Sequence, residues 1–207
     1  MKLLVIRHGQ SEGDITNVIE GHYDAPLTEL GIQQAKLMAN WIAEKYSVDK
    51  ILASPLRRAS KVAEILGERI NLDVMYDNDI MEWNIGVVGG MPISEAKVKY
   101  PDFGYFETRF PHTVRYEQES LIQLRMRAEI VLSKLINENP PDSTIAVVSH
   151  GLFIRNLGFS FLKLPVTSNL TQFPIGDTGI HEWRIDGENR TVVHVNLQRH
   201  LEALIEN

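Results

Sequence analysis

The sequence contains no cysteine, which excludes disulfide bonds, thiolate nucleophiles and thiolate metal ligands. It also lacks any long apolar run near its start, where the apolar stretch Leu3–Ile6 stops at Arg7. A signal peptide or a membrane span needs a longer run. We therefore expect a cytoplasmic protein without a membrane partner.

Positive charge is also scarce. Lysine and arginine total 21 against 27 aspartates and glutamates, which gives a formal net charge of -6. Nucleic-acid binders usually carry a basic excess, so the charge argues against a nucleic-acid partner. An anionic ligand would need a local positive pocket. With 207 residues, of which 43% are hydrophobic, the chain is expected to form a single domain over residues 1–207.

Apolar runs alternate with helical patterns along most of the chain. Strands are expected at residues 2–6, 50–53, 73–76, 144–149, 180–185 and 191–197. Helices are expected at residues 28–46, 56–69, 120–138 and 152–162, with residues 9–27 as a loop. The alternation predicts a three-layer α/β fold, in which helices cover both faces of a mostly parallel central sheet. The last two strands are expected to pair as an antiparallel hairpin.

Two of the expected strands end in the same way. The runs LLVIRHG at 3–9 and IAVVSHG at 145–151 each close on a His-Gly pair, and SPLRRAS at 54–60 follows a third strand. In open α/β sheets, ligands bind beyond the carboxyl ends of the strands. If these strands are parallel neighbours, the two histidines meet Arg7 and an arginine from 57–58 at one edge.

Such a cluster predicts an anionic ligand. Two histidines and two arginines with no carboxylate among them would repel one another unless an anion lies between them. Phosphate fits best, because guanidinium groups bind its oxygens in a bidentate manner. We also expect Gly9 and Gly151 to let the backbone approach the ligand closely.

The same residue types can transfer a phosphoryl group. A neutral imidazole can attack phosphorus in line and form a covalent intermediate, while arginines stabilise charge in the transition state. The leaving oxygen then needs a proton, which a carboxylic acid can supply. Glu82 in IMEWNIG is the candidate donor, because it follows an apolar pair in a glycine-containing loop.

Together these stretches resemble the histidine phosphatase superfamily, in its phosphoglycerate-mutase-like branch. The matching features, in the expected order, are Arg7-His8-Gly9, PLTELGIQQA at 26–35, SPLRRA at 54–59, Glu82 with Gly86, and VVSHG at 147–151. The resemblance implies the phosphoglycerate-mutase-like fold and assigns roles to five residues. They are His8 as phosphate acceptor, Glu82 as proton donor, and Arg7, Arg58 and His150 as the phosphate pocket. Gly151, where the backbone can approach closely, is also expected to bind the phosphate. Arg58 is chosen over Arg57 because the family's arginine directly precedes an alanine, here Ala59.

Two stretches depart from the family pattern. Many relatives place an asparagine six residues after the nucleophile, where this chain has Asp14. A carboxylate there would repel a phosphoryl group, so Asp14 is expected to turn away, to bind an arginine or to be protonated. Val88-Gly89-Gly90 replaces a Trp-Glu-Gly of many relatives, which changes the outer wall of the site. Arg127 is expected to be structural.

An excursion at about residues 83–118 contains a segment, 99–117, that is rich in aromatic and basic side chains. It is expected to pack over the domain, to form a lid that selects the non-phosphate part of the substrate, or to make an aromatic contact in a homodimer. In the lid interpretation, Arg109 and Arg115 bind substrate. The remaining histidines are expected to be structural or exposed: His22, His112, His181, His194 and His200.

The leading hypothesis is a metal-independent phosphomonoesterase that acts on a small phosphorylated metabolite through a phosphohistidine intermediate, without a cofactor. A cofactor-dependent phosphoglycerate mutase is the first alternative. The mutases that the chain resembles have a basic residue after the acid and a longer insertion before the second histidine. Here Trp83 follows Glu82, and only 67 residues separate Glu82 from His150.

Two further alternatives are a non-catalytic protein and a metal-dependent enzyme. A non-catalytic sensor of a phosphorylated ligand would not need a complete catalytic set, and here only the Asp14 position departs from one. A metallophosphatase would need a ligand pattern such as His-x-His, His-Glu-x-x-His or an aspartate-rich stretch, and the sequence has none. No metal site is therefore predicted.

Overall fold

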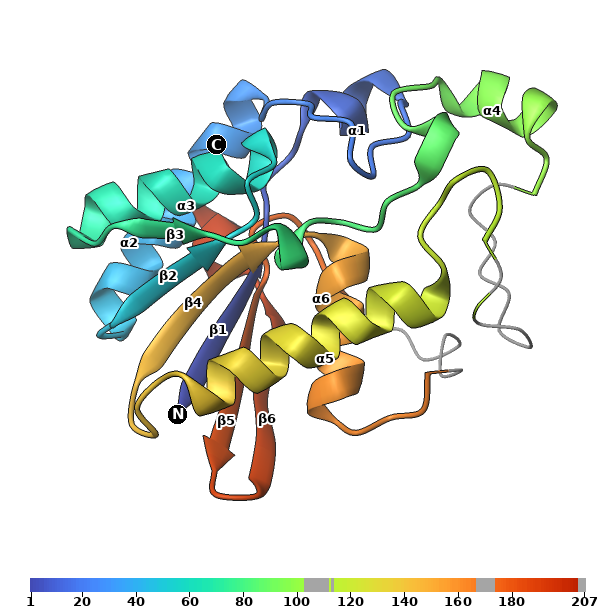
Figure 1. The fold of residues 1–207 in the computed structure, drawn as a ribbon. Helices are drawn as coiled ribbons and strands as arrows, with labels where there is room; N and C mark the ends of the chain where they lie inside the picture. Colours follow the sequence, from blue (N-terminus) through green and yellow to red (C-terminus); the bar gives the residue numbers. More distant parts are fainter. Residues whose placement is uncertain (103–111, 113, 167–173, 205–207) are drawn as a thin grey trace.

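A computed structural model describes residues 1–102, 112, 114–166 and 174–204 (Figure 1). Its helices and strands follow one another as β1 (Lys2–Arg7), α1 (Glu12–Thr16), α2 (Glu29–Lys45), β2 (Lys50–Ala53), α3 (Arg57–Ile70), β3 (Val74–Tyr76), the 3-10 turns η1 (Asn78–Ile80) and η2 (Gly86–Val88), α4 (Ile93–Lys99), α5 (Leu121–Asn137), β4 (Thr144–Ser149), α6 (Gly151–Phe161), β5 (Ile180–Asp186), β6 (Asn189–Leu197) and the 3-10 turn η3 (Arg199–Leu204). None of the described helices is both long and apolar enough to cross a membrane.

Six strands form one sheet in the order β3-β2-β4-β1-β5-β6. The four strands from β3 to β1 are parallel, whereas β5 runs antiparallel to β1 and β6 antiparallel to β5. The predicted mostly parallel sheet and its closing antiparallel hairpin are confirmed. Since β1 and β4 are neighbours and β4 also pairs with β2, the three strand ends singled out in the sequence lie side by side.

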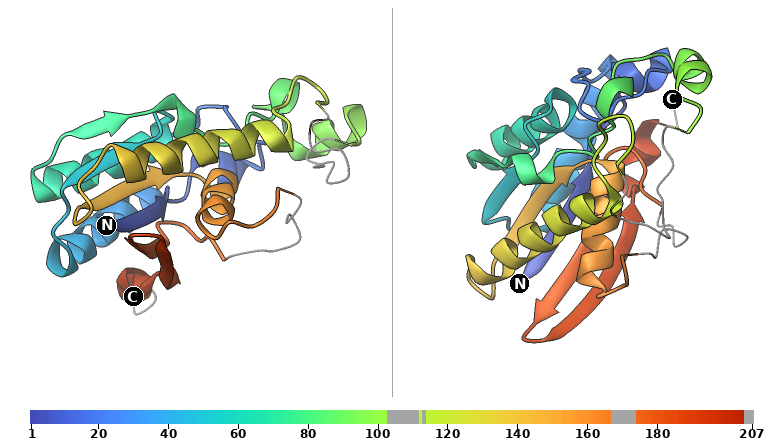
Figure 2. Two further views of the ribbon diagram at one scale, coloured as in Figure 1. Left: turned by 60° about the horizontal axis from the view of Figure 1, so that its bottom comes forward. Right: turned by 45° about the vertical axis from the view of Figure 1, so that its right-hand side comes forward.

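The two central strands supply both faces of the sheet. In β1, Leu3 and Val5 pack with residues of α5 and α6, while Leu4 and Ile6 pack with residues of α2 and α3. Successive strand residues point to opposite faces, so an unbroken apolar run feeds two cores. Figures 1 and 2 show the resulting three layers, with α5 and α6 on one face and α2 and α3 on the other.

Side-chain caps fix where two of these helices begin. The Thr28 side chain accepts a hydrogen bond from the Gly31 amide at the start of α2. Ser120 and Gln123 form a capping box at the start of α5, in which each side chain accepts from the other residue's backbone. Such caps satisfy amides that have no partner inside the helix. They explain why the predicted starts of both helices agree with the structure.

Two short helices differ from the expectation. The segment 9–27, predicted as a loop, contains α1, and the excursion at residues 83–118 contains α4. Neither helix is long enough to show a clear 3.6-residue period in the sequence. A bridge between Val18 and Pro92 joins the two segments. Both helices lie at the end of the molecule toward which β1 and β4 point (Figure 1).

Candidate active site

The strand register brings the two histidines together. Arg7 of β1 lies opposite Ser149 of β4, so the next residues along the chain, His8 and His150, are also neighbours. Their ring centroids are 5.1 Å apart, and both side chains are buried. On the other side of β4, the amide of Ser54 donates to the carbonyl of Val148, which brings the SPLRRA segment to the same edge.

His8 is held as a neutral imidazole with one free nitrogen. Burial lowers its pKa well below the ordinary value, and the charges of Arg7 and Arg58 lower it further. Its Nδ1 lies 2.7 Å from the carbonyl oxygen of Gly9. A carbonyl can only accept, so Nδ1 carries the proton and Nε2 keeps its lone pair. A neutral imidazole with an available Nε2 is a competent nucleophile.

His150 is also neutral, because burial lowers its pKa, followed by the charges of Arg58 and His8. Its Nε2 lies 2.8 Å from the Ser54 hydroxyl, which itself accepts the Leu56 amide at 3.3 Å. The hydroxyl hydrogen can be donated to Nε2, and in that tautomer the imidazole proton lies on Nδ1. In the described part of the chain, this buried Nδ1 has no hydrogen-bond partner.

Arg58 is fully buried, and the loop after α1 fixes its guanidinium. Nη1 donates to the Tyr23 carbonyl at 3.0 Å and Nη2 to the Gly21 carbonyl at 2.8 Å. Its Nε makes no hydrogen bond to any described residue. Arg57, its neighbour in the sequence, is exposed. The choice of Arg58 as the inward-facing arginine agrees with this geometry.

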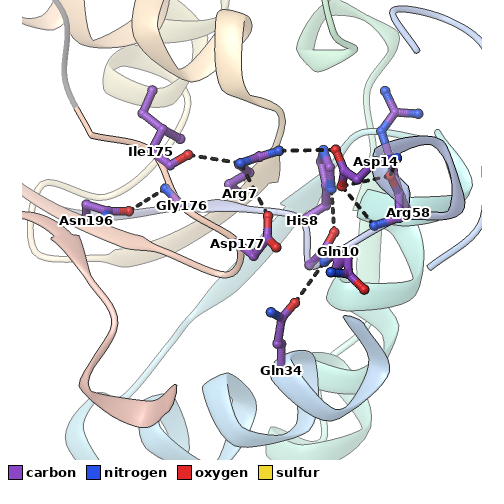
Figure 3. Close-up of polar contacts among 12 residues, drawn as sticks. Arg7, His8, Gln10, Asp14, Gln34, Arg58, Ile175, Gly176, Asp177 and Asn196 are labelled. Atoms are coloured by element: carbon purple, nitrogen blue, oxygen red, sulfur yellow. Dashed lines mark hydrogen bonds and ion pairs between the residues drawn. The ribbon is translucent and has the colours of Figure 1, made fainter. Parts of the chain in front are cut away.

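Arg7 lies between two segments of the chain (Figure 3). Its Nη1 donates to the Ile175 carbonyl at 3.0 Å and lies 3.3 Å from Asp177. On the other side, its Nη2 is 3.9 Å from the Asp14 carboxylate, which also accepts from the backbone amide of Ser11. Like that of Arg58, the buried Nε of Arg7 has no hydrogen-bond partner among the described residues.

The expectation that no carboxylate lies among these cations is wrong. Asp14 and Asp177 flank Arg7, and Glu20 lies 3.4 Å from the Nε of Arg58. Burial raises the pKa of Glu20 and of Asp177, although Arg58 and Arg7, respectively, oppose the shift. Without a bound anion, these carboxylates offset the charge of the pocket. The sequence offered no signal for Glu20 or Asp177, which reach the arginines through loop contacts.

Glu82 lies at the amino terminus of α6, next to His150. Its Oε1 accepts from the amides of Trp83 at 2.9 Å and Phe153 at 3.0 Å, and its Oε2 accepts from Leu152 at 3.1 Å. Three amide donors hold the carboxyl group in one orientation. Oε2 has one amide partner and Oε1 has two.

These groups face one cleft of about 250 Å³. The residues that line it are Arg7, His8, Glu20, Glu82, Gly151, Leu152, Arg155 and Ile175. Four of the predicted site residues therefore line the cleft: Arg7, His8, Glu82 and Gly151. Arg58 and His150 are buried beside His8. Arg155 was missed by the sequence reasoning. Its spacing of four residues from Gly151 on a helix, which puts both on one face, was the available signal.

The two glycines serve different purposes. A Cβ on Gly151 would meet only Glu82, at 3.9 Å, so this glycine opens toward the cleft. A Cβ on Gly9 would lie 2.7 Å from the carbonyl oxygen of Gly31 in α2. Gly9 therefore permits close packing of α2 against the end of β1, and the expectation that it also lets the backbone approach the ligand stays a prediction.

The structure describes some of the residues that were expected outside the phosphate pocket. The Arg115 side chain pairs with Asp102 at 2.8 Å on the surface, while Arg109 lies outside the described residues. The lid hypothesis stays a prediction. Arg127 pairs with Glu119 at 2.6 Å and donates to the carbonyls of Asp79 and Met81, which is the structural role expected for it.

The other histidines are structural or partly exposed. Nε2 of His22 donates to the Glu82 carbonyl at 2.8 Å, so His22 supports the loop that carries the acid. His200 is buried against the Thr178 hydroxyl, and His194 is half-exposed beside Glu182. Burial lowers the pKa of His181 to about 4.

The chain is similar to known proteins in sequence and in fold. It is 28% identical over 202 residues to phosphoserine phosphatase 1 of Hydrogenobacter thermophilus, a match that covers 97% of this chain and 94% of that protein. It is 29% identical over 171 residues to a protein of Yersinia pestis named probable phosphoglycerate mutase, with coverage of 80% and 76%. A solved structure of a mycobacterial glucosyl-3-phosphoglycerate phosphatase with VO3 superposes with a TM-score of 0.83 at 25% identity, covering 94% of this chain and 98% of that one.

A family model provides the assignment. The model of the histidine phosphatase superfamily, branch 1, matches residues 3–198, a range that contains both histidines, both arginines and Glu82. The match spans the sheet and every element that borders the cleft. The neutral histidine pair, the inward-facing arginines and this match together show that the chain belongs to the histidine phosphatase superfamily and is a phosphatase of its phosphoglycerate-mutase-like branch.

Proposed function

We propose that the protein is a metal-independent phosphomonoesterase that hydrolyses a small phosphorylated metabolite through a phosphohistidine on His8, without a cofactor. One observation carries the proposal: three buried nitrogens around neutral His8 lack hydrogen-bond partners in the described structure. They are Nε of Arg7, Nε of Arg58 and Nδ1 of His150. Buried donors without acceptors are unfavourable, and the oxygens of a phosphoryl group would satisfy them.

The first half-reaction transfers the phosphoryl group to the enzyme. The lone pair of His8 Nε2 attacks phosphorus, and the bond from phosphorus to the ester oxygen breaks as the new N–P bond forms. Glu82 gives a proton to the departing oxygen, so the product leaves as a neutral alcohol. The two arginines and His150 stabilise the charge on the equatorial oxygens.

The second half-reaction returns the enzyme to its starting state. Glu82, now ionised, takes a proton from water while the water oxygen attacks phosphorus. The N–P bond breaks, inorganic phosphate forms, and His8 recovers its lone pair. The same carboxyl group therefore acts first as an acid and then as a base, and protons balance over the cycle.

Two observations favour hydrolysis of a small metabolite over the mutase alternative. Trp83 follows the acid where the resembled mutases have a basic residue, and it is buried, with Nε1 donating to the Glu119 carbonyl at 2.6 Å. It packs into the core and cannot hold a substrate carboxylate. The two phosphatases compared above are named for phosphoserine and for glucosyl-3-phosphoglycerate, both small phosphorylated metabolites.

Trapping the intermediate tests the mechanism. A rapid quench with labelled substrate should give a phosphoenzyme that is labile in acid and stable in base, on the peptide that contains His8. His8→Ala should lose the label and lower turnover of p-nitrophenyl phosphate by about a thousandfold or more. Label on a serine or aspartate would contradict the proposal.

A chelator tests metal independence. Phosphate release from a panel of phosphomonoesters, measured with and without excess EDTA, should be unchanged by the chelator. Activity that is lost with EDTA and restored by a divalent cation would support the metallophosphatase alternative. Turnover of no phosphomonoester, together with tight binding of one, would support the sensor alternative.

A further inference from the structure

Arg155 lines the catalytic cleft, and its Nε is a buried donor without an acceptor among the described residues. It projects from α6 on the same face as Gly151, into the cleft that contains His8 and Arg7. Over the residues that the structure describes, its side chain makes no hydrogen bond or ion pair, and its buried Nε is unsatisfied. Arg7 and Arg58 each have a carboxylate within 4 Å, so Arg155 differs from both.

The geometry of α6 places Arg155 on the side of the leaving group. Gly151 lies one turn before Arg155 on the same face of the helix, and a Cβ at Gly151 would lie 3.9 Å from Oε2 of Glu82. Arg155 and Glu82 line the same cleft, and the charge of Glu82 opposes the lowering of the Arg155 pKa by burial. Arg155 is therefore on the side of the proposed proton donor. Glu82 faces the leaving oxygen, so Arg155 faces the group to which that oxygen is attached.

A guanidinium in this position favours an anionic leaving group. Arginine remains charged in proteins, and a partly buried charge without a partner is unfavourable. A planar carboxylate can bind it through two parallel hydrogen bonds. Glu20 and Glu82 also line the cleft and would repel a second, doubly charged phosphate. The volume of about 250 Å³, bounded by Leu152 and Ile175, suits a short carbon chain.

We infer that Arg155 binds a carboxylate on the leaving group, and that the substrate is therefore a phosphate monoester of a small hydroxy acid. The inference rests on the proposed function, because it assumes that the phosphoryl group lies between His8 and the two arginines. It adds a residue that determines specificity and a chemical class of substrate.

Two pairs of substrates isolate the carboxylate. 3-Phosphoglycerate and glycerol 3-phosphate differ in a carboxylate against a hydroxymethyl group, and O-phosphoserine differs from phosphoethanolamine in a carboxylate alone. The wild-type protein should prefer the carboxylate-bearing member of at least one pair by about tenfold or more in kcat/KM. In Arg155→Met the preference should fall to about one, mainly through a higher KM for the acid. Arg155→Lys should retain part of it.

Three controls separate this role from others. Arg155→Met should melt at the wild-type temperature, and its loss of kcat/KM on the carboxylate-bearing substrate should exceed its loss on p-nitrophenyl phosphate by about tenfold or more, while the pH profile for p-nitrophenyl phosphate keeps its shape. Arg57→Gln removes an exposed arginine of the neighbouring strand end and should leave the substrate preference unchanged. An equal loss on every substrate, or a shifted pH profile for p-nitrophenyl phosphate, would overturn the inference and show that Arg155 acts through Glu82.

Failure of the inference can be told from failure of the proposed function. If no phosphomonoester is hydrolysed, the proposed function fails. Calorimetric binding of 3-phosphoglycerate and glycerol 3-phosphate to His8→Ala protein, with and without Arg155→Met, then still tests the subsite. Equal affinity for the two ligands in His8→Ala, or no wild-type preference in either substrate pair, would overturn the role of Arg155 alone.

Discussion

At the scale of single residues, the charge state of the empty pocket follows from Glu20. Its carboxylate lies 3.4 Å from the Nε of Arg58 and accepts from the Ser11 hydroxyl at 2.6 Å. An incoming anion would approach the same edge of the guanidinium. Glu20 therefore stabilises the ligand-free protein and competes with the ligand, so its protonation state should be visible in anion binding.

Glu20→Gln should strengthen inhibition by sulfate, which stays doubly charged over the working pH range. Removing one nearby negative charge should lower the inhibition constant about tenfold, because unit charges about 4 Å apart interact by roughly 1 to 4 kcal/mol in solvated sites. The measurement is competitive inhibition of p-nitrophenyl phosphate hydrolysis at neutral pH. Weaker inhibition in Glu20→Gln would show that Glu20 positions Arg58 and does not compete with the anion.

The same pair predicts a pH dependence. Because burial raises the pKa of Glu20, its carboxyl group gains a proton as the pH falls through that raised value, and its repulsion of the anion is then lost. Sulfate inhibition of the wild type should strengthen between neutral pH and the ordinary range of a glutamate, near about 4.3. Glu20→Gln should show less of this dependence. The histidines contribute little in this window, because their pKa values are lowered.

Glu82→Gln tests proton donation. General acid catalysis contributes roughly 10² to 10⁴ in rate, so alkyl phosphates should slow by about a hundredfold or more. p-Nitrophenyl phosphate, whose leaving group is stable without a proton, should slow by less than about tenfold. The amide oxygen can still accept from Trp83 and Phe153, and a melting curve checks that it does. Equal losses on both classes of substrate would assign Glu82 a structural role.

At the scale of helices and strands, the sequence predicted the elements that have a regular apolar pattern. The unbroken apolar runs of β1 and β4 and the apolar stripe of α5 identify elements buried on one or both faces. Their shared His-Gly endings then predicted that His8 and His150 meet. The short helix α1 was not predictable, because it ends before a second turn is complete.

The contacts of loops with side chains were not predictable either. Glu20 reaches Arg58 only because the carbonyls of Gly21 and Tyr23 hold the guanidinium against that loop. Asp177 reaches Arg7 from the segment before β5, which is distant in sequence and has no repeating pattern. Long-range contacts of this kind depend on tertiary packing, which a single sequence does not display.

Gly9 gives a prediction at this scale. Gly9→Ala should lower the free energy of unfolding by about 1 to 3 kcal/mol, because the added Cβ would push α2 away from the end of β1. Gly151→Ala is the matched control, since its Cβ would have only an ordinary contact, and it should change stability by less than about 0.5 kcal/mol. Urea unfolding measures both. An unchanged Gly9→Ala protein would mean that the Gly9–Gly31 contact relaxes without cost.

At the scale of the whole molecule, hydrolysis and isomerisation differ in what happens to the first product. A mutase must retain the dephosphorylated product and exclude water from the phosphohistidine. Given 3-phosphoglycerate and a trace of 2,3-bisphosphoglycerate, this protein should release inorganic phosphate faster than it forms 2-phosphoglycerate. Coupled assays for inorganic phosphate and for 2-phosphoglycerate, run in parallel, compare the two rates. Isomerisation much faster than phosphate release from any phosphomonoester would establish the mutase alternative.

The first turns of α6 have a consequence for how such an enzyme can diverge. This helix begins beside His150, holds Glu82 through the amides of Leu152 and Phe153, and presents Arg155 to the cleft. One short stretch of backbone, the start of α6, therefore fixes the distance between Glu82 and His150. Substitutions at position 155 or in the outer wall can change the accepted substrate while leaving that separation intact. A lineage built on this helix can acquire new metabolic roles by a few exchanges, without rebuilding its chemistry.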